Sequence, residues 1–138
     1  MLTDLIDRLR EAKEGSRELD RDIAISTFQG SKDNAEYARQ AVVSHGAKPH
    51  HFEVCGISGI SLHTPEPVTT SLDAAVSLCE RLFPGCEHGY YQYRHRPGDE
   101  YARATVAKIG GPYVEDVKAR TPALALCLAV LLAKGEGE

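Results

Sequence analysis

The chain has 138 residues, 42% of them hydrophobic and 26% charged, and its formal net charge at pH 7 is −4. This composition is close to the globular average and suggests neither a disordered chain nor a membrane protein. The acidic balance argues against a binder of the phosphate backbone, because such proteins usually carry a basic surplus. We therefore expect one domain over residues 1–138, with neither a membrane nor a nucleic acid among its partners.

Helical patterns dominate the first third of the chain. The run LTDLIDRLREA has leucine and isoleucine at helical spacing and is followed by Gly15, where a helix commonly stops. Ser16 then offers a new N-cap ahead of RELDRDIAIST, which continues one apolar face. The run SKDNAEYARQAVVSHG, from Ser31 to Gly46, repeats the same pattern. These residues predict three helices before Pro49.

The composition changes after Pro49. The segment HHFEVCGI alternates apolar and polar residues around Phe52 and Val54, and this alternation is typical of a strand. The following GISGISLHTPEP is interrupted by glycine and proline and predicts a loop. We expect one strand in this region and no further regular element before the next helix.

A capping signal precedes the central apolar segment. The tetrapeptide TSLD at 70–73 places a hydroxyl three residues before an acidic side chain, and apolar residues then recur at helical spacing. The dipeptide Pro84-Gly85 ends the run. These signals predict a helix over residues 71–83.

Three strand patterns occupy residues 88–119. They are HGYYQYRHR, EYARATVAKI and PYVEDVKAR, separated by turn signals at 97–99 and 110–112. The simplest arrangement of three strands joined by short turns is an antiparallel meander. Together with the helices, these strands predict an α+β fold with an antiparallel sheet of about three to four strands.

A strongly apolar helix is expected after Arg120. Thr121 supplies an N-cap, and Pro122 suits the first helical turn. The twelve apolar residues 122–133 are too few to span a bilayer, which takes about 20 residues. A helix that is apolar on every side must be buried on more than one side. It lies either beneath the sheet among other helices or at a subunit contact, and the sequence leaves both alternatives open.

Three blocks of the sequence together resemble a known family. They are LTDLIDRLREAKEGSRELDRDIA at the start, PVTTSLDAAVSLC in the middle and TPALALCLAVLLA at the end. Their letters, order and spacing are similar to those of the phage ABA sandwich domain, a group of small proteins encoded by bacteriophages and prophages. The resemblance implies an αβα sandwich with helices on both faces of the sheet, but no established activity. It also marks residues 28–65 as an insert particular to this member.

The stretch YYQYRHRP, which begins at Tyr90, has the composition most typical of a ligand-binding site. Tyrosine rings can stack on a base or a sugar, and arginine can pair with phosphate. If the stretch is extended, Tyr90, Arg94 and Arg96 share one face. With Arg103 from the next strand pattern, they form the predicted ligand-binding site. The alternative is an ordinary strand with one face packed under a helix and the other merely polar.

No catalytic, cofactor or metal site is indicated. Cys79, Cys86, His88 and His95 lie near one another in the sequence, but they contain no close ligand pair such as C-x2-C, and the two histidines face opposite ways on a strand. The GISGIS segment departs from the nucleophile-elbow pattern, and no phosphate-loop pattern is present. The cysteines are expected to be reduced, with Cys79 and Cys127 acting as small apolar residues.

A compact domain of this kind most readily works by binding something. We expect a non-enzymatic binding protein, made by a phage or prophage, that acts on a host component and sequesters a nucleotide-like signalling molecule against host defence. A homo-oligomer with pockets at the subunit contact would suit this function. The alternative is a structural or assembly accessory that binds another phage protein through its apolar helices.

Two further expectations concern location and chemistry. The opening MLTDLIDRLREA has no apolar stretch of the kind a secretion signal needs, which predicts the host cytoplasm. An enzyme is not expected, although His50, His51 and His63 could converge through the loop-rich segment.

Overall fold

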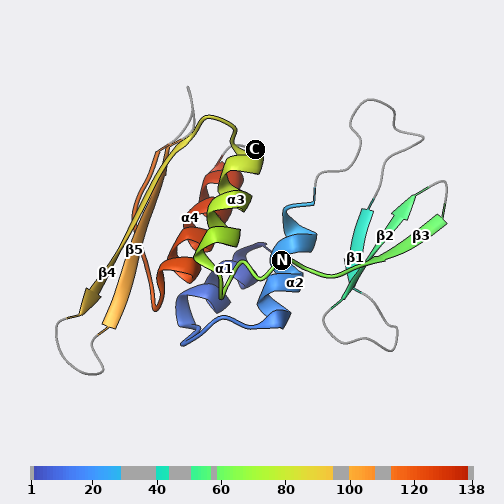
Figure 1. The fold of residues 1–138 in the computed structure, drawn as a ribbon, viewed down its shortest axis with the longest axis horizontal. Helices are drawn as coiled ribbons and strands as arrows, with labels where there is room; N and C mark the ends of the chain where they lie inside the picture. The colour runs from blue at the N-terminus through green and yellow to red at the C-terminus, as the bar shows by residue number, and fades with distance from the viewer. Residues whose placement is uncertain are drawn as a thin grey trace. The chain divides into compact units, whose positions relative to one another are not determined.

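The computed structural model describes residues 2–28, 40–43, 51–56, 59–94, 100–107 and 113–136. Over these residues the chain forms four α-helices and six β-strands, an α+β fold as the sequence predicts (Figure 1). The chain divides into two compact units, one of Met1–Ser16 with Pro67–Glu138 and one of Arg17–Glu66. The second unit contains the whole of the segment, residues 28–65, that the sequence marks as an insert. That the two units fold as one domain stays a prediction.

The first unit contains a three-stranded antiparallel sheet. Its helices are α1 (Leu2–Glu11), α3 (Leu72–Leu82) and α4 (Pro122–Glu136), and its strands are β4 (Glu87–Arg94), β5 (Glu100–Ala107) and β6 (Tyr113–Ala119). The sheet order is β4-β5-β6, so each strand pairs with its neighbour in the sequence, and the predicted meander is confirmed. The predicted turns at 97–99 and 110–112 lie outside the described residues.

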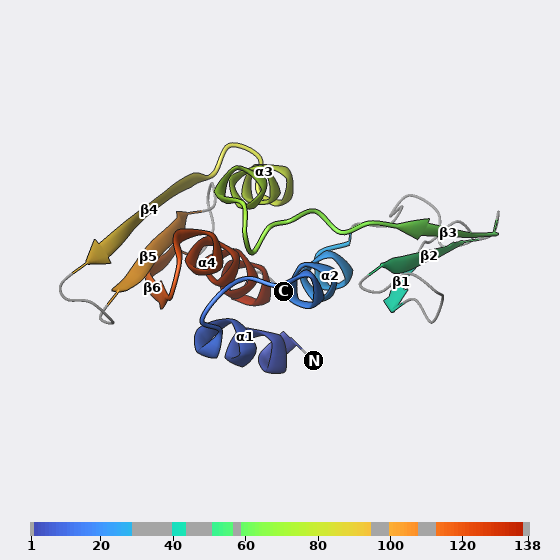
Figure 2. The same cartoon turned by 60° about the horizontal axis from the view of Figure 1, so that its bottom comes forward.

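Helix α4 forms the centre of this unit. Every residue from Ala123 to Leu131 is at most 5% exposed, and Ala133 is fully buried. One side of the helix lies against the sheet, and α1 and α3 contact it on other sides (Figure 2). The strongly apolar helix is therefore buried within its own chain, which was one of the two alternatives that the sequence left open.

The layers of the first unit are the sheet, then α4, then α1 with α3. In both views the three helices lie on the same side of the sheet (Figures 1 and 2). Helices on both faces, as in an αβα sandwich, are not shown by the described residues. Strand β5 explains the one-sided packing: Ala102, Ala104 and Val106 are buried, whereas the alternating Arg103 and Thr105 are partly exposed.

Side-chain caps begin two helices, and the cap of α3 lies one residue later than the sequence predicts. The capping box points to Thr70, but the N-cap is Ser71, whose Oγ accepts a hydrogen bond from the Ala74 N–H at 3.3 Å. The Oγ1 of Thr121 accepts a hydrogen bond from the Leu124 N–H at 3.2 Å, at the start of α4. Each cap gives a partner to an N–H that has none inside its helix.

A buried threonine joins the segment after α1 to the segment before α3. The hydroxyl of Thr69, a residue only 1% exposed, accepts a hydrogen bond from the Ser16 N–H at 3.0 Å and donates one to the Ser16 carbonyl at 3.1 Å. The backbone of Gly15 passes so close that a Cβ there would collide with the Thr69 carbonyl. Helix α1 already ends at Glu11, so Gly15 allows a close approach of two backbone segments and is not the residue at which the helix stops.

The second unit combines one helix with a second small sheet. It contains α2 (Arg17–Ser26), β1 (Gln40–Val43), β2 (Phe52–Gly56) and β3 (Gly59–His63), and its antiparallel sheet has the order β1-β2-β3. The Arg17 guanidinium donates hydrogen bonds to the Asp20 carboxylate at 2.8 Å and to the Pro65 carbonyl at 2.7 Å. Phe52 and His63, which are paired across β2 and β3, stack with ring centroids 5.5 Å apart.

The predicted third helix is wrong at its end. Residues 40–43 form β1, which pairs with β2 from Gln40 opposite Cys55 to Val43 opposite Phe52. The two adjacent valines of this segment favour an extended backbone once β2 offers a partner. The rest of the predicted helix, residues 31–39 and 44–46, lies outside the described residues.

The predicted loop after β2 also contains a strand. Residues 59–63 form β3, which pairs with β2 from Gly59 opposite Gly56 to His63 opposite Phe52. Glycine and proline dominate the wider segment and suggest a loop, but ISLH alternates apolar and polar residues in the manner of a strand. The alternation is short, and its pairing with β2 decides its conformation.

Candidate functional site

The pairing of β4 with β5 sorts the predicted ligand-binding residues by face. Tyr90 is opposite Ala104, which is 1% exposed and belongs to the buried face of β5. Directly paired side chains lie on the same face, so Tyr90 is on the α4 side of the sheet. Arg103 is opposite Tyr91 and lies on the outer face, away from α4. The sheet thus separates Tyr90 from Arg103 and does not bring them into one site.

The remaining predicted residues lie at or beyond the end of β4. Arg94 is its last residue and is paired with Glu100, whereas Arg96 is outside the described residues. Tyr90 is 45% exposed, because α4 lies mainly against β5 and β6 and leaves the edge strand β4 partly uncovered. Joint ligand binding by Tyr90, Arg94 and Arg96 stays a prediction.

The outer face carries a second group of aromatic and basic side chains. Tyr91, Arg103 and Lys118 form one row across β4, β5 and β6. Tyr101, two residues before Arg103, adds its ring: the Lys118 Nζ lies 4.3 Å from the ring centroid, and the Arg103 Cζ lies 5.7 Å from it. Tyr91 is 45% exposed, and Lys118 is also exposed. We call Tyr91, Tyr101, Arg103 and Lys118 the outer-face cluster.

Both basic groups of the outer-face cluster lie near the face of the Tyr101 ring. Both lie within the roughly 6 Å at which a cation is attracted to the face of an aromatic ring, and each such contact is worth about 0.5–1 kcal/mol at an exposed site. The ring of Tyr101 is therefore a common support for the guanidinium of Arg103 and the ammonium of Lys118. Two basic groups are brought together although the chain as a whole is acidic.

The chemistry of the outer-face cluster suits an anion that also carries a flat ring. A guanidinium offers a rigid fork of donors that matches phosphate or carboxylate, and an ammonium adds a compact positive charge. An exposed tyrosine ring in the same row offers a surface on which a flat, unsaturated ring can stack. The described helices of the first unit lie on the other face of the sheet (Figure 2), and Tyr91 and Lys118 are exposed on this one.

The sequence contained part of the signal for this cluster. The alternation of EYARATVA already places Tyr101 and Arg103 on one face of a strand. It does not reveal that Tyr91 and Lys118 flank Arg103, because the register between strands is set by pairing across the sheet. Of the predicted ligand-binding residues, the cluster includes only Arg103.

Of His50, His51 and His63, two lie within the described residues, and the convergence of all three on one site stays a prediction. The Nε2 of His51 lies 3.0 Å from the Thr64 hydroxyl, and the ring of His63 stacks on Phe52. His50 lies outside the described residues. Within the described ranges, no three histidine, cysteine, aspartate or glutamate side chains lie close enough together to hold a metal ion.

No family model, curated protein or solved structure matches the chain. The resemblance to phage ABA sandwich domains therefore stays a prediction, as does the phage or prophage origin that it implies.

The four helices of the described part of the chain include none that is both long enough and apolar enough to cross a membrane.

Proposed function

We propose that this protein is a non-enzymatic binding protein that captures a small nucleotide-like anion on the outer-face cluster. In its fuller form, the proposal is that a phage or prophage encodes the protein and that it sequesters a host signalling molecule in the host cytoplasm. The observation that carries the binding proposal is the pair of basic groups over the Tyr101 ring, beside the exposed Tyr91.

A nucleotide offers one chemical group for each part of the outer-face cluster. Its phosphate can accept parallel hydrogen bonds from the Arg103 guanidinium and is attracted by the ammonium of Lys118. Its base can stack on the exposed ring of Tyr91, and such stacking is worth about 1–3 kcal/mol per base. The proposed site keeps Arg103 from the sequence prediction and takes Tyr91 in place of Tyr90.

The outer-face cluster lies on strands whose opposite faces are packed in the core. The buried faces of β5 and β6, which include Ala102, Ala104 and Val117, pack within the core of the first unit. Side chains that start from a packed sheet lose less conformational entropy on binding than side chains on a loop. This rigidity supports a binding role for the outer face.

The alternative function is an accessory protein that binds another phage protein through its apolar helices. The most apolar helix, α4, is buried inside the first unit from Ala123 to Leu131. It therefore offers no apolar face to a partner over these residues. The same burial removes the reason to expect a homo-oligomer that forms through α4, and an oligomer through another surface stays a prediction.

A binding titration with paired variants tests the proposal. The probes are mononucleotides and cyclic dinucleotides that carry a fluorescent label, with inorganic phosphate as a competitor. We expect Arg103→Ala with Lys118→Ala to weaken binding at least about tenfold, because it removes two charge-assisted contacts. Arg10→Ala with Lys13→Ala removes the same charge from another surface and should leave the affinity unchanged.

The titration also separates the two candidate sites. Arg94→Ala with Arg96→Ala should weaken binding if the ligand occupies the edge of β4 that the sequence predicts. Equal affinity in all three double variants, or no binding of any probe, would contradict capture on the outer face. Native mass spectrometry of the protein from bacterial cytosol, before and after denaturation, would show a co-purified ligand as a released nucleotide-sized species.

A further inference from the structure

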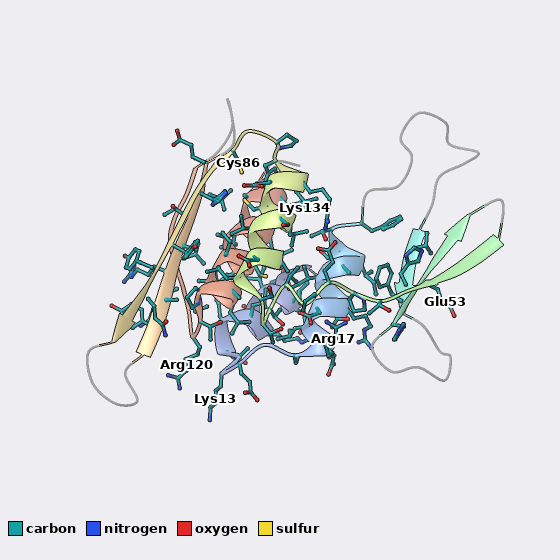
Figure 3. All side chains as sticks on the ribbon, viewed as in Figure 1. Lys13, Arg17, Glu53, Cys86, Arg120 and Lys134 are labelled. Atoms are coloured by element: carbon teal, nitrogen blue, oxygen red, sulfur yellow. The ribbon has the colours of Figure 1, made fainter. Side chains whose placement is uncertain are left out.

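Two cysteine sulfurs are in contact where α3 leads into β4. Cys79 lies in the last turn of α3, and Cys86 directly precedes β4. Their Sγ atoms are 3.4 Å apart, and the two residues are not joined by a disulfide. Figure 3 labels Cys86 in the segment that links α3 to β4.

The turn after α3 brings the two sulfurs together. The Phe83 N–H donates a hydrogen bond to the Cys79 carbonyl at 2.9 Å, and the Cys86 N–H donates one to the Phe83 carbonyl at 3.0 Å. Gly85 has a φ of 76°, a left-handed conformation that glycine adopts readily, and it reverses the chain. Cys86 therefore returns over the last turn of α3, where its Sγ lies 3.9 Å from the Cys79 carbonyl oxygen.

The two thiols differ in their access to solvent. Cys79 is fully buried, whereas Cys86 is partly exposed. Burial raises the pKa of the Cys79 thiol to about 12, with smaller contributions from its hydrogen bond to Cys86 and from the negative charges of Cys86 and Glu80. At neutral pH the Cys79 thiol keeps its proton and reacts poorly with reagents in solution. A reagent therefore meets Cys86 first.

We infer that Cys86 and Cys79 form a dithiol site for small disulfides, in which Cys86 is the entry thiol and Cys79 is the resolving thiol. The ligand and oxidant is a low-molecular-weight disulfide of the general formula R–S–S–R. The product is an intramolecular disulfide that joins the last turn of α3 to the start of β4.

The reaction consists of two thiol–disulfide exchanges. In the first, the Cys86 thiolate attacks one sulfur of R–S–S–R; a mixed disulfide forms, and the released thiolate takes up the proton that Cys86 lost. In the second, Cys79 loses its proton, the Cys79 thiolate attacks the Cys86 sulfur, and the leaving thiolate R–S⁻ takes up a proton. The two cysteines lose two electrons in total, and R–S–S–R is reduced to two molecules of R–SH.

Proximity favours the second exchange. A disulfide bond is about 2.05 Å long, so two sulfurs that already lie 3.4 Å apart need only a small movement to bond. Holding two reacting groups together also makes their reaction far faster than a collision in solution. Cys127 gives a comparison within the same chain, because it is fully buried in α4 and its thiol donates to the Val68 carbonyl at 3.2 Å.

Intact-mass spectrometry with glutathione disulfide as the probe tests the inference. All proteins carry Cys55→Ser, which leaves Cys79, Cys86 and Cys127 as the remaining thiols. We expect the parent protein to lose two hydrogen atoms and to retain no adduct. Cys79→Ala should instead keep one glutathione adduct on Cys86, because the resolving thiol is absent. Cys86→Ala should form at least about tenfold less adduct, since its remaining thiols are buried.

Two controls identify the bond. Cys127→Ala should behave as the parent protein does, losing two hydrogen atoms. Trypsin cleaves after Arg81, between the two cysteines, so the oxidised parent should yield two peptides that remain linked until a reductant is added. The oxidised protein should also have a higher Tm than the reduced protein, because the bond restricts the unfolded chain.

Several results would overturn the inference. They are a lasting adduct on the parent protein, equal adduct formation by Cys79→Ala and Cys86→Ala, and no reaction of the parent protein at a large excess of glutathione disulfide. Circular dichroism checks that each variant is folded. If Cys79→Ala does not fold, Cys79→Ser replaces it, and the peptide map of the parent protein decides the outcome without any change at Cys79.

Discussion

The requirement for glycine at position 15 comes from packing against Thr69. In the sequence it is a helix stop, but its backbone lies directly against the Thr69 carbonyl, and Thr69 exchanges two hydrogen bonds with Ser16. A Cβ at this position would have to displace backbone atoms, which cannot move aside as the end of a flexible side chain can. The requirement for glycine is therefore a property of packing between distant segments.

We expect Gly15→Ala to lower the free energy of unfolding by about 1–3 kcal/mol, the usual cost of overpacking. Gly89→Ala is the matched control, because among the described residues a Cβ at position 89 would meet only the Thr105 hydroxyl, at 3.4 Å. That change should be neutral or slightly stabilising, since alanine restricts the unfolded chain. Urea unfolding followed by circular dichroism measures both, and similar midpoints for the two variants would contradict the packing argument.

Composition alone could predict only part of the candidate site. Tyrosine and arginine in β4 and β5 indicated a binding surface, and Arg103 does belong to a cluster of aromatic and basic side chains. The predicted partner Tyr90 lies on the other face, because its register partner is Ala104. The alternation of side chains within one strand can be predicted from the sequence. The neighbours of a residue on the adjacent strands depend on the register, which the sequence does not show.

The bounds of the helix that has both a capping residue and a turn at its ends were predicted to within one residue. Helix α3 runs from Leu72 to Leu82, against a prediction of 71–83, because its serine cap and the following Pro84-Gly85 act within a few residues. Strands β1 and β3 were missed, because each has only four or five residues and depends on pairing with β2. Short strands gain their stability from the partner strand and carry a weak pattern of their own.

Helix α4 should be the element most sensitive to truncation of its side chains. We expect Leu126→Ala to lower the free energy of unfolding by about 2–5 kcal/mol, because Leu126 is fully buried and its loss leaves a cavity. Leu132→Ala is the matched control on the same helix. Leu132 is only partly buried, so its truncation should lower the free energy of unfolding by less. Chemical denaturation measures both changes, and an equal loss at the two positions would contradict a core centred on α4.

The first unit is built from two parts of the chain that are far apart in the sequence. Residues 1–16 and 67–138 form one compact unit, and residues 17–66 form the other. The hydrogen bonds between Ser16 and Thr69 hold the two ends of the first unit close together. A unit whose ends meet in this way can receive an insertion without a change in its own core.

We expect the first unit to fold when residues 17–66 are replaced by a short glycine-serine linker. Its sheet and the helices α1, α3 and α4 all remain in that shortened chain. The linker variant should unfold cooperatively, with a smaller denaturant m-value because less surface is exposed on unfolding. It should also keep any nucleotide affinity of the outer-face cluster. Loss of a cooperative transition would show that the two units fold only together.

Caps, turns and periodicity act over a few residues, so the α+β class, the helices α3 and α4 and the meander of β4, β5 and β6 could be predicted from the residues alone. Three other features became visible only in the folded chain: α4 is covered by its own chain, Arg103 lies beside Tyr91 and Lys118, and the sulfurs of Cys79 and Cys86 are in contact. These features depend on strand register and on the packing of segments far apart in the chain, which no local pattern encodes.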